Sequence, residues 1–160
     1  MEIRDARPED AAAACVVLRR SIAELCGADH RDDPAILAAW LANKTAESFL
    51  GWIGRPDNSV LVAEEGDMLL AVGSVTDAGT IGLAYVSPDA RFRGVSDALL
   101  RALEARAAAR GNRTCTLTST ETARRFYRAR GYVETGAPDG AFGTTSGYPM
   151  AKALPSAATR

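Results

Sequence analysis

Residues 85–96 have the sequence YVSPDARFRGVS, and they decide which fold the chain adopts. The apolar run over residues 81–86 predicts a strand, and apolar residues at helical spacing predict a helix over residues 95–110. The first backbone N–H groups of such a helix have no partner within the helix, and the helix dipole favours an anion there. The segment therefore predicts a strand, a tight loop and a helix that together can bind a phosphate group.

The rest of the chain surrounds this segment with further strands and helices. Before it, the patterns predict a strand at 2–6, helices at 8–25, after Pro34 and at 46–53, and strands at 60–63 and 69–72. After it, they predict a strand at 113–117, a helix at 120–130, a strand at 132–134, a glycine-rich loop at 137–147 and a strand at 148–151. The strand–helix–strand order from Ile81 to Leu117 implies a parallel pair in a mostly antiparallel sheet. The predicted class is α+β with a mixed sheet, as one domain over residues 1–154 with a disordered tail at 155–160.

Composition limits the classes of partner. The chain has 160 residues and a formal net charge of −1, which disfavours binding to nucleic acid or to an acidic membrane surface. No apolar run approaches the length of a membrane span or a signal segment. Its three cysteines are widely spaced, without metal-ligand pairing, which favours a reducing compartment and predicts a cytoplasmic protein without a metal.

Two segments carry a resemblance to a known family. Arg91, Gly94 and Ser96 follow a spacing that resembles Gln/Arg-x-x-Gly-x-Gly/Ala, the phosphate-binding motif of the GCN5-related N-acetyltransferase (GNAT) family. Residues 120–132, TETARRFYRARGY, resemble the family's second motif, Asn-x-x-Ala-x-x-Phe-Tyr-x-x-x-Gly-Phe. Ser96 stands where the family usually has Gly or Ala, and Thr120 stands where asparagine is common. The order of elements resembles that of the family across nearly the whole chain.

The resemblance implies the GNAT-like acyl-CoA N-acyltransferase fold, with helices on both faces of a twisted sheet. It places acetyl-CoA between two splayed parallel strands, where a backbone N–H near Ala84 or Tyr85 polarises the thioester carbonyl. Gly82 lies in the first of these strands, where glycine is typical of a bulge or a close backbone approach. The implied cofactor-binding residues are Tyr85, Val86, Arg91, Arg93, Gly94, Val95, Ser96, Thr120 and Ala123.

Tyr127 matches the tyrosine that family members use as general acid toward the departing thiolate. The alternative is that Tyr127 continues the apolar stripe of its helix and packs in the core. A tyrosine titrates near pH ~10 and a thiol near ~8.5, so full proton transfer between unperturbed groups is uphill by about 2 kcal/mol. Tyr127 is therefore either assisted or donates a hydrogen bond to the developing charge on sulfur.

The acceptor side of the site carries no family motif. Between Thr80 and Val86 there is no carboxylate to act as general base. At pH 7 an α-amine is more than about 10% neutral, whereas a lysine side chain is about 0.04% neutral. The absence of a carboxylate therefore favours an α-amine as acceptor rather than a lysine side chain. We predict that Glu24, Asp29 and His30 bind the acceptor and that specificity resides in residues 24–40 and 137–147. These segments contain five acids that would attract a cationic amine: Glu24, Asp29, Asp32, Asp33 and Asp139. The alternative is that the acids are solvated helix ends and His30 a solvated loop residue.

The resulting prediction is an enzyme that transfers the acetyl group of acetyl-CoA directly to a small-molecule or peptide amine in a ternary complex. The alternative from another class is a non-catalytic acyl-CoA-binding sensor domain of the same fold. The sequence leaves open the acceptor, the base, the preferred acyl group and the oligomeric state, for which a homodimer is one option.

Overall fold

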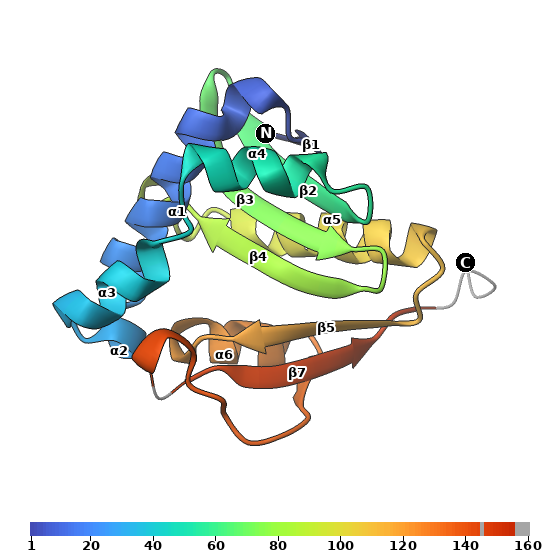
Figure 1. Cartoon of the computed structure of the whole chain (residues 1–160). Helices are drawn as coiled ribbons and strands as arrows, with labels where there is room; N and C mark the ends of the chain where they lie inside the picture. The colour runs from blue at the N-terminus through green and yellow to red at the C-terminus, as the bar shows by residue number, and fades with distance from the viewer. Residues whose placement is uncertain (145, 156–160) are drawn as a thin grey trace.

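The computed structural model describes residues 1–144 and 146–155, which form a seven-stranded sheet in the order β1-β2-β3-β4-β5-β7-β6 (Figure 1). The strands are β1 (Glu2–Asp5), β2 (Asn58–Glu65), β3 (Met68–Thr76), β4 (Thr80–Val86), β5 (Thr114–Ser119), β6 (Val133–Glu134) and β7 (Tyr148–Ala153). The helices are α1 (Ala11–Leu25), α2 (Gly27–His30), α3 (Pro34–Leu41), α4 (Ala46–Gly54), α5 (Val95–Ala109) and α6 (Glu121–Ala129). Three short 3-10 turns complete the described elements: η1 (Pro8–Asp10), η2 (Pro88–Ala90) and η3 (Ala141–Gly143).

The predicted fold class is confirmed, because among the described strands only β4 and β5 pair in parallel. The sequence patterns did not predict α2, a single helical turn directly after α1. The predicted disordered tail at 155–160 lies, apart from Pro155, outside the described residues. No helix within the described part of the chain is long and apolar enough to cross a bilayer.

Helices cover both faces of the sheet because successive strand residues point to opposite sides. In β2, Val60 and Val62 belong to the cluster that includes α1 and Phe49 of α4. Leu61 and Ala63, between and after them, belong to the cluster with α5 on the other face. Strands β2 and β3 are therefore buried on both sides, which explains their nearly continuous apolar sequence.

The parallel strands β4 and β5 pair over only two positions, Thr80 with Thr116 and Ile81 with Leu117. Beyond Ile81 the two strands separate, and Figure 1 shows β4 and β5 apart in the middle of the sheet. Gly82 lies at the start of this separation, where the register between β3 and β4 shifts. A Cβ at Gly82 would lie 3.1 Å from the hydroxyl of Ser74, so glycine permits a close approach of the two strands. Among the described residues, the edge of β4 that faces β5 therefore has no paired strand beyond Ile81.

Candidate active site

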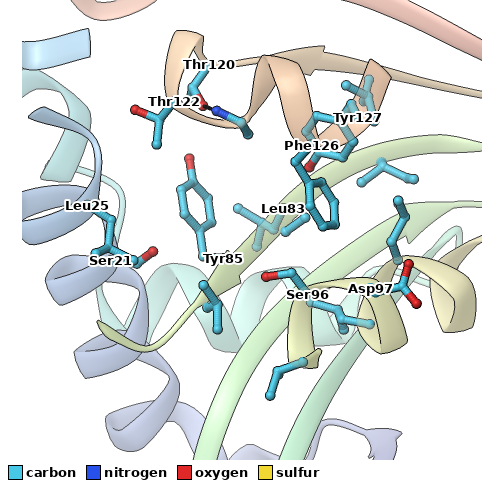
Figure 2. A pocket seen from close by; sticks show the side chains of 18 of the residues that line it. Ser21, Leu25, Leu83, Tyr85, Ser96, Asp97, Thr120, Thr122, Phe126 and Tyr127 are labelled. Atoms are coloured by element: carbon cyan, nitrogen blue, oxygen red, sulfur yellow. Dashed lines mark hydrogen bonds between the residues drawn. The ribbon is translucent and has the colours of Figure 1, made fainter. Parts of the chain in front are cut away.

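A cavity of about 440 Å³ lies where β4 and β5 separate (Figure 2). We call it the first cavity. Its walls come from β4 and β5, the loop before α5, the first two turns of α5, α6 and the end of α1. Eight of the nine residues predicted to bind the cofactor line it: Tyr85, Val86, Arg91, Gly94, Val95, Ser96, Thr120 and Ala123.

One end of the first cavity is the start of α5. Gly94 precedes this helix with φ of 76°, in the left-handed region that glycine adopts without strain. A Cβ at Gly94 would meet no atom within 4 Å, so the space beside it is open. Val95, Ser96 and Asp97 line the cavity at the first turn of α5, whose N–H groups have no partner within the helix. Together with Arg91, this end of the cavity fits a diphosphate.

Arg93 is the predicted cofactor residue that does not line the first cavity. Its guanidinium donates a hydrogen bond of 2.7 Å to Glu65, at the end of β2. That hydrogen bond holds the pKa of the Glu65 carboxyl below its usual value. The sequence spacing could not separate the roles of Arg91 and Arg93, because the partner of Arg93 comes from a strand 28 residues earlier.

The opposite wall of the first cavity is the first turn of α6. Thr120 caps this helix, and its hydroxyl accepts a hydrogen bond of 3.0 Å from the backbone N–H of Ala123. Phe126 and Arg130, which the sequence analysis did not assign to the site, also line the cavity. Arg130 is held over the ring of Phe126, 3.7 Å from its centroid, and donates a 2.8 Å hydrogen bond to Asp97 of α5. This contact joins the two helices on either side of the cavity.

Tyr127 both packs in the core and lines the first cavity. It is 7% exposed and makes edge-to-face contacts with Phe126 and Tyr132, at centroid distances of 5.3 and 5.5 Å. Its hydroxyl makes no hydrogen bond to any residue that the structure describes, so it is available to a ligand. Burial raises the pKa of Tyr127 above its usual value, which keeps the hydroxyl protonated at neutral pH.

The family model of the acetyltransferase (GNAT) domain matches residues 28–154, which include both cavity-lining motifs. This chain belongs to the GNAT family. Among curated protein sequences, none matches this GNAT chain significantly.

Solved structures support the assignment of the fold. A GCN5-related N-acetyltransferase from Rhodopseudomonas palustris is 27% identical, with a TM-score of 0.84 over 96% of this chain and 95% of that one. The PaiA N-acetyltransferase from Thermoplasma acidophilum, solved in complex with coenzyme A, is 22% identical, with a TM-score of 0.80 over 96% and 98%. An aminoglycoside 6′-N-acetyltransferase from Enterococcus faecium is 18% identical, with a TM-score of 0.70 over 97% and 98%. The last two likenesses show the shared GNAT fold alone.

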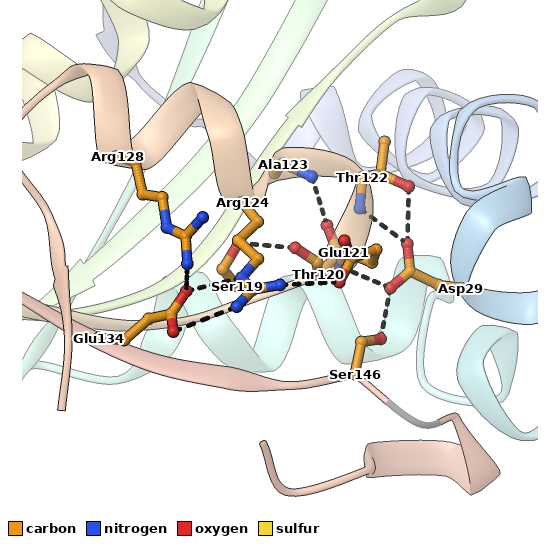
Figure 3. Close-up of polar contacts among 10 residues, drawn as sticks. All are labelled: Asp29, Ser119, Thr120, Glu121, Thr122, Ala123, Arg124, Arg128, Glu134 and Ser146. Atoms are coloured by element: carbon orange, nitrogen blue, oxygen red, sulfur yellow. Dashed lines mark hydrogen bonds and ion pairs between the residues drawn. The ribbon is translucent and has the colours of Figure 1, made fainter. Parts of the chain in front are cut away.

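The residues predicted to bind the acceptor do not line the first cavity of this GNAT domain. Asp29 is 3% exposed and accepts hydrogen bonds from Ser146, from the backbone N–H groups of Glu121 and Thr122, and from the Thr122 hydroxyl (Figure 3). It therefore caps the start of α6 from a different element of the chain. Neither Asp29 nor its neighbour His30 lines a cavity described here.

His30 is buried and Glu24 is exposed, and each has a partner within the chain. His30 is fully buried, with one ring nitrogen 2.9 Å from the carbonyl of Ile22 and the other accepting from the backbone N–H of Asp32. Glu24 is paired with Arg20 of the same helix, and Arg20 is also paired with Asp89. Asp89 lies in the loop of residues 87–94 before α5, which we call the phosphate loop. In the sequence, polar residues beside Gly27 are typical of a solvated loop. In the structure α2 packs against α6, and Asp29 and His30 are buried.

A second cavity, of about 410 Å³, lies on the face of the sheet that α4 covers. Its lining includes the aromatic residues Trp40, Trp52, Tyr85 and Phe142, the cations Lys44 and Arg55, and many hydroxyl and amide side chains. The sequence analysis assigned no role to Lys44 or Trp52, since they lie far apart in the sequence and follow no shared motif. Phe142 belongs to the segment 137–147, in which it placed acceptor specificity. Among the described residues, no group of three or more His, Cys, Asp and Glu side chains is placed to hold a metal ion.

Proposed function

We propose that this protein transfers the acetyl group of acetyl-CoA directly to a primary amine. One observation carries the proposal: the two cavities share the lining residues Gly82, Leu83, Tyr85, Thr118 and Thr120. These residues surround the gap between β4 and β5. A coenzyme in the first cavity and an amine in the second would therefore meet at this gap.

The first cavity supplies what acetyl-CoA requires. The N-terminus of α5 and Arg91 bind the diphosphate, and the free edge of β4 offers backbone groups to the extended pantetheine arm. A backbone N–H near Ala84 or Tyr85 polarises the thioester carbonyl and stabilises the oxyanion that forms on attack. Cys26 lines the same cavity, but burial raises the pKa of its thiol to about 12. So little thiolate is present at neutral pH that direct transfer is favoured over an acyl-enzyme.

The transfer forms one C–N bond and breaks one C–S bond. The neutral amine attacks the carbonyl carbon, and the amine nitrogen gives one proton to solvent. Coenzyme A leaves as a thiolate, which takes up one proton from solvent to become the thiol. Tyr127 donates a hydrogen bond to the developing charge on sulfur. Because burial raises the pKa of Tyr127, full proton transfer to sulfur is even less favourable than for an exposed tyrosine, so stabilisation by the hydrogen bond is its main role.

The experiment measures coenzyme A release from acetyl-CoA with a panel of primary amines, with mass spectrometry of the N-acetylated product. Transfer to at least one amine, together with a rise in melting temperature on addition of acetyl-CoA, is the expected result. A rise in melting temperature without transfer to any amine would contradict the enzyme and favour an acyl-CoA sensor of the same fold. We also propose a cytoplasmic location, which the three unpaired cysteines support.

A further inference from the structure

The second cavity contains a buried cation, Lys44, in the connection between α3 and α4. Lys44 is 4% exposed, and its ammonium group donates a hydrogen bond of 2.6 Å to the side-chain carbonyl of Asn43. It also lies 5.5 Å from the centroid of the Phe142 ring. No carboxylate of the described residues lies within 4.0 Å of it, and burial lowers the pKa of Lys44 to about 8. A buried ammonium group without an acidic partner is costly to the folded protein and typical of a binding site.

The charges around the second cavity are positive on balance. Lys44 and Arg55 line it, and no Asp or Glu of the described residues does. Asp57 pairs with Arg55 at 3.3 Å, but both of these side chains are 59% exposed, so solvent screens the pair. The Asp29 carboxylate accepts hydrogen bonds from the Ser146 hydroxyl and from the backbone N–H of Glu121 at the start of α6. The acids predicted to attract a cationic amine, Glu24, Asp29, Asp32, Asp33 and Asp139, do not line the second cavity.

The remaining walls favour an apolar or planar body. Trp40 and Phe142 are stacked, with centroids 6.1 Å apart and ring planes 11° from parallel. Trp52 and Tyr85 line the same cavity. Aromatic faces of this kind bury large apolar surfaces with little loss of side-chain freedom. The second cavity therefore combines aromatic walls with an ammonium group that has no carboxylate partner among the described residues.

We propose that the second cavity binds a primary amine that carries a carboxylate on an apolar or aromatic body, in the manner of an α-amino acid, with the Lys44 ammonium group binding the carboxylate. This inference rests on the proposed acetyl transfer. The amine nitrogen then points to the gap between β4 and β5, which the cavity reaches at Gly82 and Thr118. The product is an N-acetyl amino acid, and its amide no longer has an ammonium group that the positive cavity would repel.

The first test compares acceptors that differ mainly in the carboxylate. Phenylalanine, tryptophan and leucine are measured against their amides, with spermidine and kanamycin as polycationic amines. We expect kcat/KM for each acid to be at least 10-fold higher than kcat/KM for its amide. The ratio of kcat/KM for each acid to that for the polycations should be larger still. The amides have the more acidic ammonium groups, so a larger neutral fraction cannot explain a preference for the acids. A wild-type preference for amides or polycations overturns this inference and leaves acetyl transfer intact.

The second test is the variant Lys44→Met. It keeps an unbranched stem, and the contacts of Cys15 and Arg19 with position 44 use only the backbone carbonyl, so the fold is retained. We expect KM for phenylalanine to rise at least 10-fold, with KM for phenylalaninamide and for acetyl-CoA unchanged. Lys44→Arg keeps the charge and should retain the preference for the acid. Arg113→Gln removes an exposed cation outside both cavities and serves as the matched control. Equal effects of Lys44→Met on acid and amide would overturn the assignment of Lys44.

A binding experiment separates the two proposals. Trp40 and Trp52 are the two tryptophans of the chain, and both line the second cavity. In the presence of coenzyme A, N-acetylphenylalanine should change their fluorescence in the wild type and not in Lys44→Met. This result without transfer to any amine would support the carboxylate site and contradict the enzyme. Absence of both binding and transfer would overturn both.

Discussion

The carboxylate of Asp29 in α2 accepts hydrogen bonds from the backbone N–H and the hydroxyl of Thr122 in α6, at 3.2 and 2.6 Å (Figure 3). The two residues are 93 positions apart, yet the contact makes one helix cap another. Since Thr120 and Ala123 of the same turn line the first cavity, the capping carboxylate positions one wall of the proposed coenzyme site.

Replacement of Asp29 should therefore affect both stability and coenzyme binding. We expect Asp29→Asn to lower the free energy of unfolding by about 2 kcal/mol, because hydrogen bonds to a charged acceptor are replaced by weaker neutral ones. Affinity for coenzyme A should fall with it, since the first turn of α6 loses its anchor. Denaturant unfolding and calorimetric titration provide the two measurements. Asp32→Asn, at a side chain that is 92% exposed, is the control and should change neither. Unchanged stability in Asp29→Asn would contradict the capping role.

Arg91 and Arg93 provide a comparison within one loop. Arg91 lines the first cavity, whereas Arg93 is paired with Glu65 on the surface. We expect Arg91→Gln to raise the Kd for coenzyme A about 10-fold, the usual effect of losing one charge-assisted hydrogen bond. Arg93→Gln should change it less than about 2-fold, since an exposed ion pair contributes little. If Arg93→Gln weakens binding as much as Arg91→Gln, then both arginines contact the coenzyme, as the sequence analysis predicts.

Gly94 and Gly66 form a second matched pair. Both have positive φ, 76° and 61°, and a Cβ at either would meet no atom within 4 Å. Gly94→Glu and Gly66→Glu should therefore suffer similar backbone strain, of order 1 kcal/mol. Only Gly94→Glu adds a carboxylate where the diphosphate is proposed to bind, so only this variant should lose the rise in melting temperature on addition of acetyl-CoA. A full rise in a folded Gly94→Glu protein would move the phosphate site away from α5.

These cases show which parts of the structure the sequence predicts. The phosphate loop and α5 follow from local patterns, because Gly94 and the helix start act on their own neighbours in the chain. The mixed sheet follows from the strand–helix–strand order between Ile81 and Leu117. Asp29 and Lys44 could not be interpreted in this way, since the burial of each depends on contacts with distant elements. A polar residue beside a turn is usually exposed, and only the tertiary packing makes these two interior.

Tyr127→Phe tests the role of the hydroxyl separately from packing. We expect the chemical rate to fall at least ~10-fold with unchanged affinity for coenzyme A, because a hydrogen bond made only in the transition state is lost. Single-turnover kinetics measures the chemical step. Tyr132→Phe is the control, since Tyr132 contacts Tyr127 but its hydroxyl donates to Glu104 and it does not line either cavity. Equal rate losses in both variants would assign Tyr127 to packing alone.

The dependence of kcat on pH tests the state of the Tyr127 hydroxyl. Tyr127 acts in its protonated form, so activity is lost as the pH rises through its pKa. An exposed tyrosine titrates near ~10, and burial raises the pKa of Tyr127 above that value. With saturating amine and acetyl-CoA, kcat should therefore not fall between about pH 8 and pH 10. Initial rates are measured with the spontaneous hydrolysis of the thioester subtracted. A fall in kcat centred at or below the ordinary tyrosine pKa, present in the wild type and absent in Tyr127→Phe, would show that the first cavity does not keep this hydroxyl protonated.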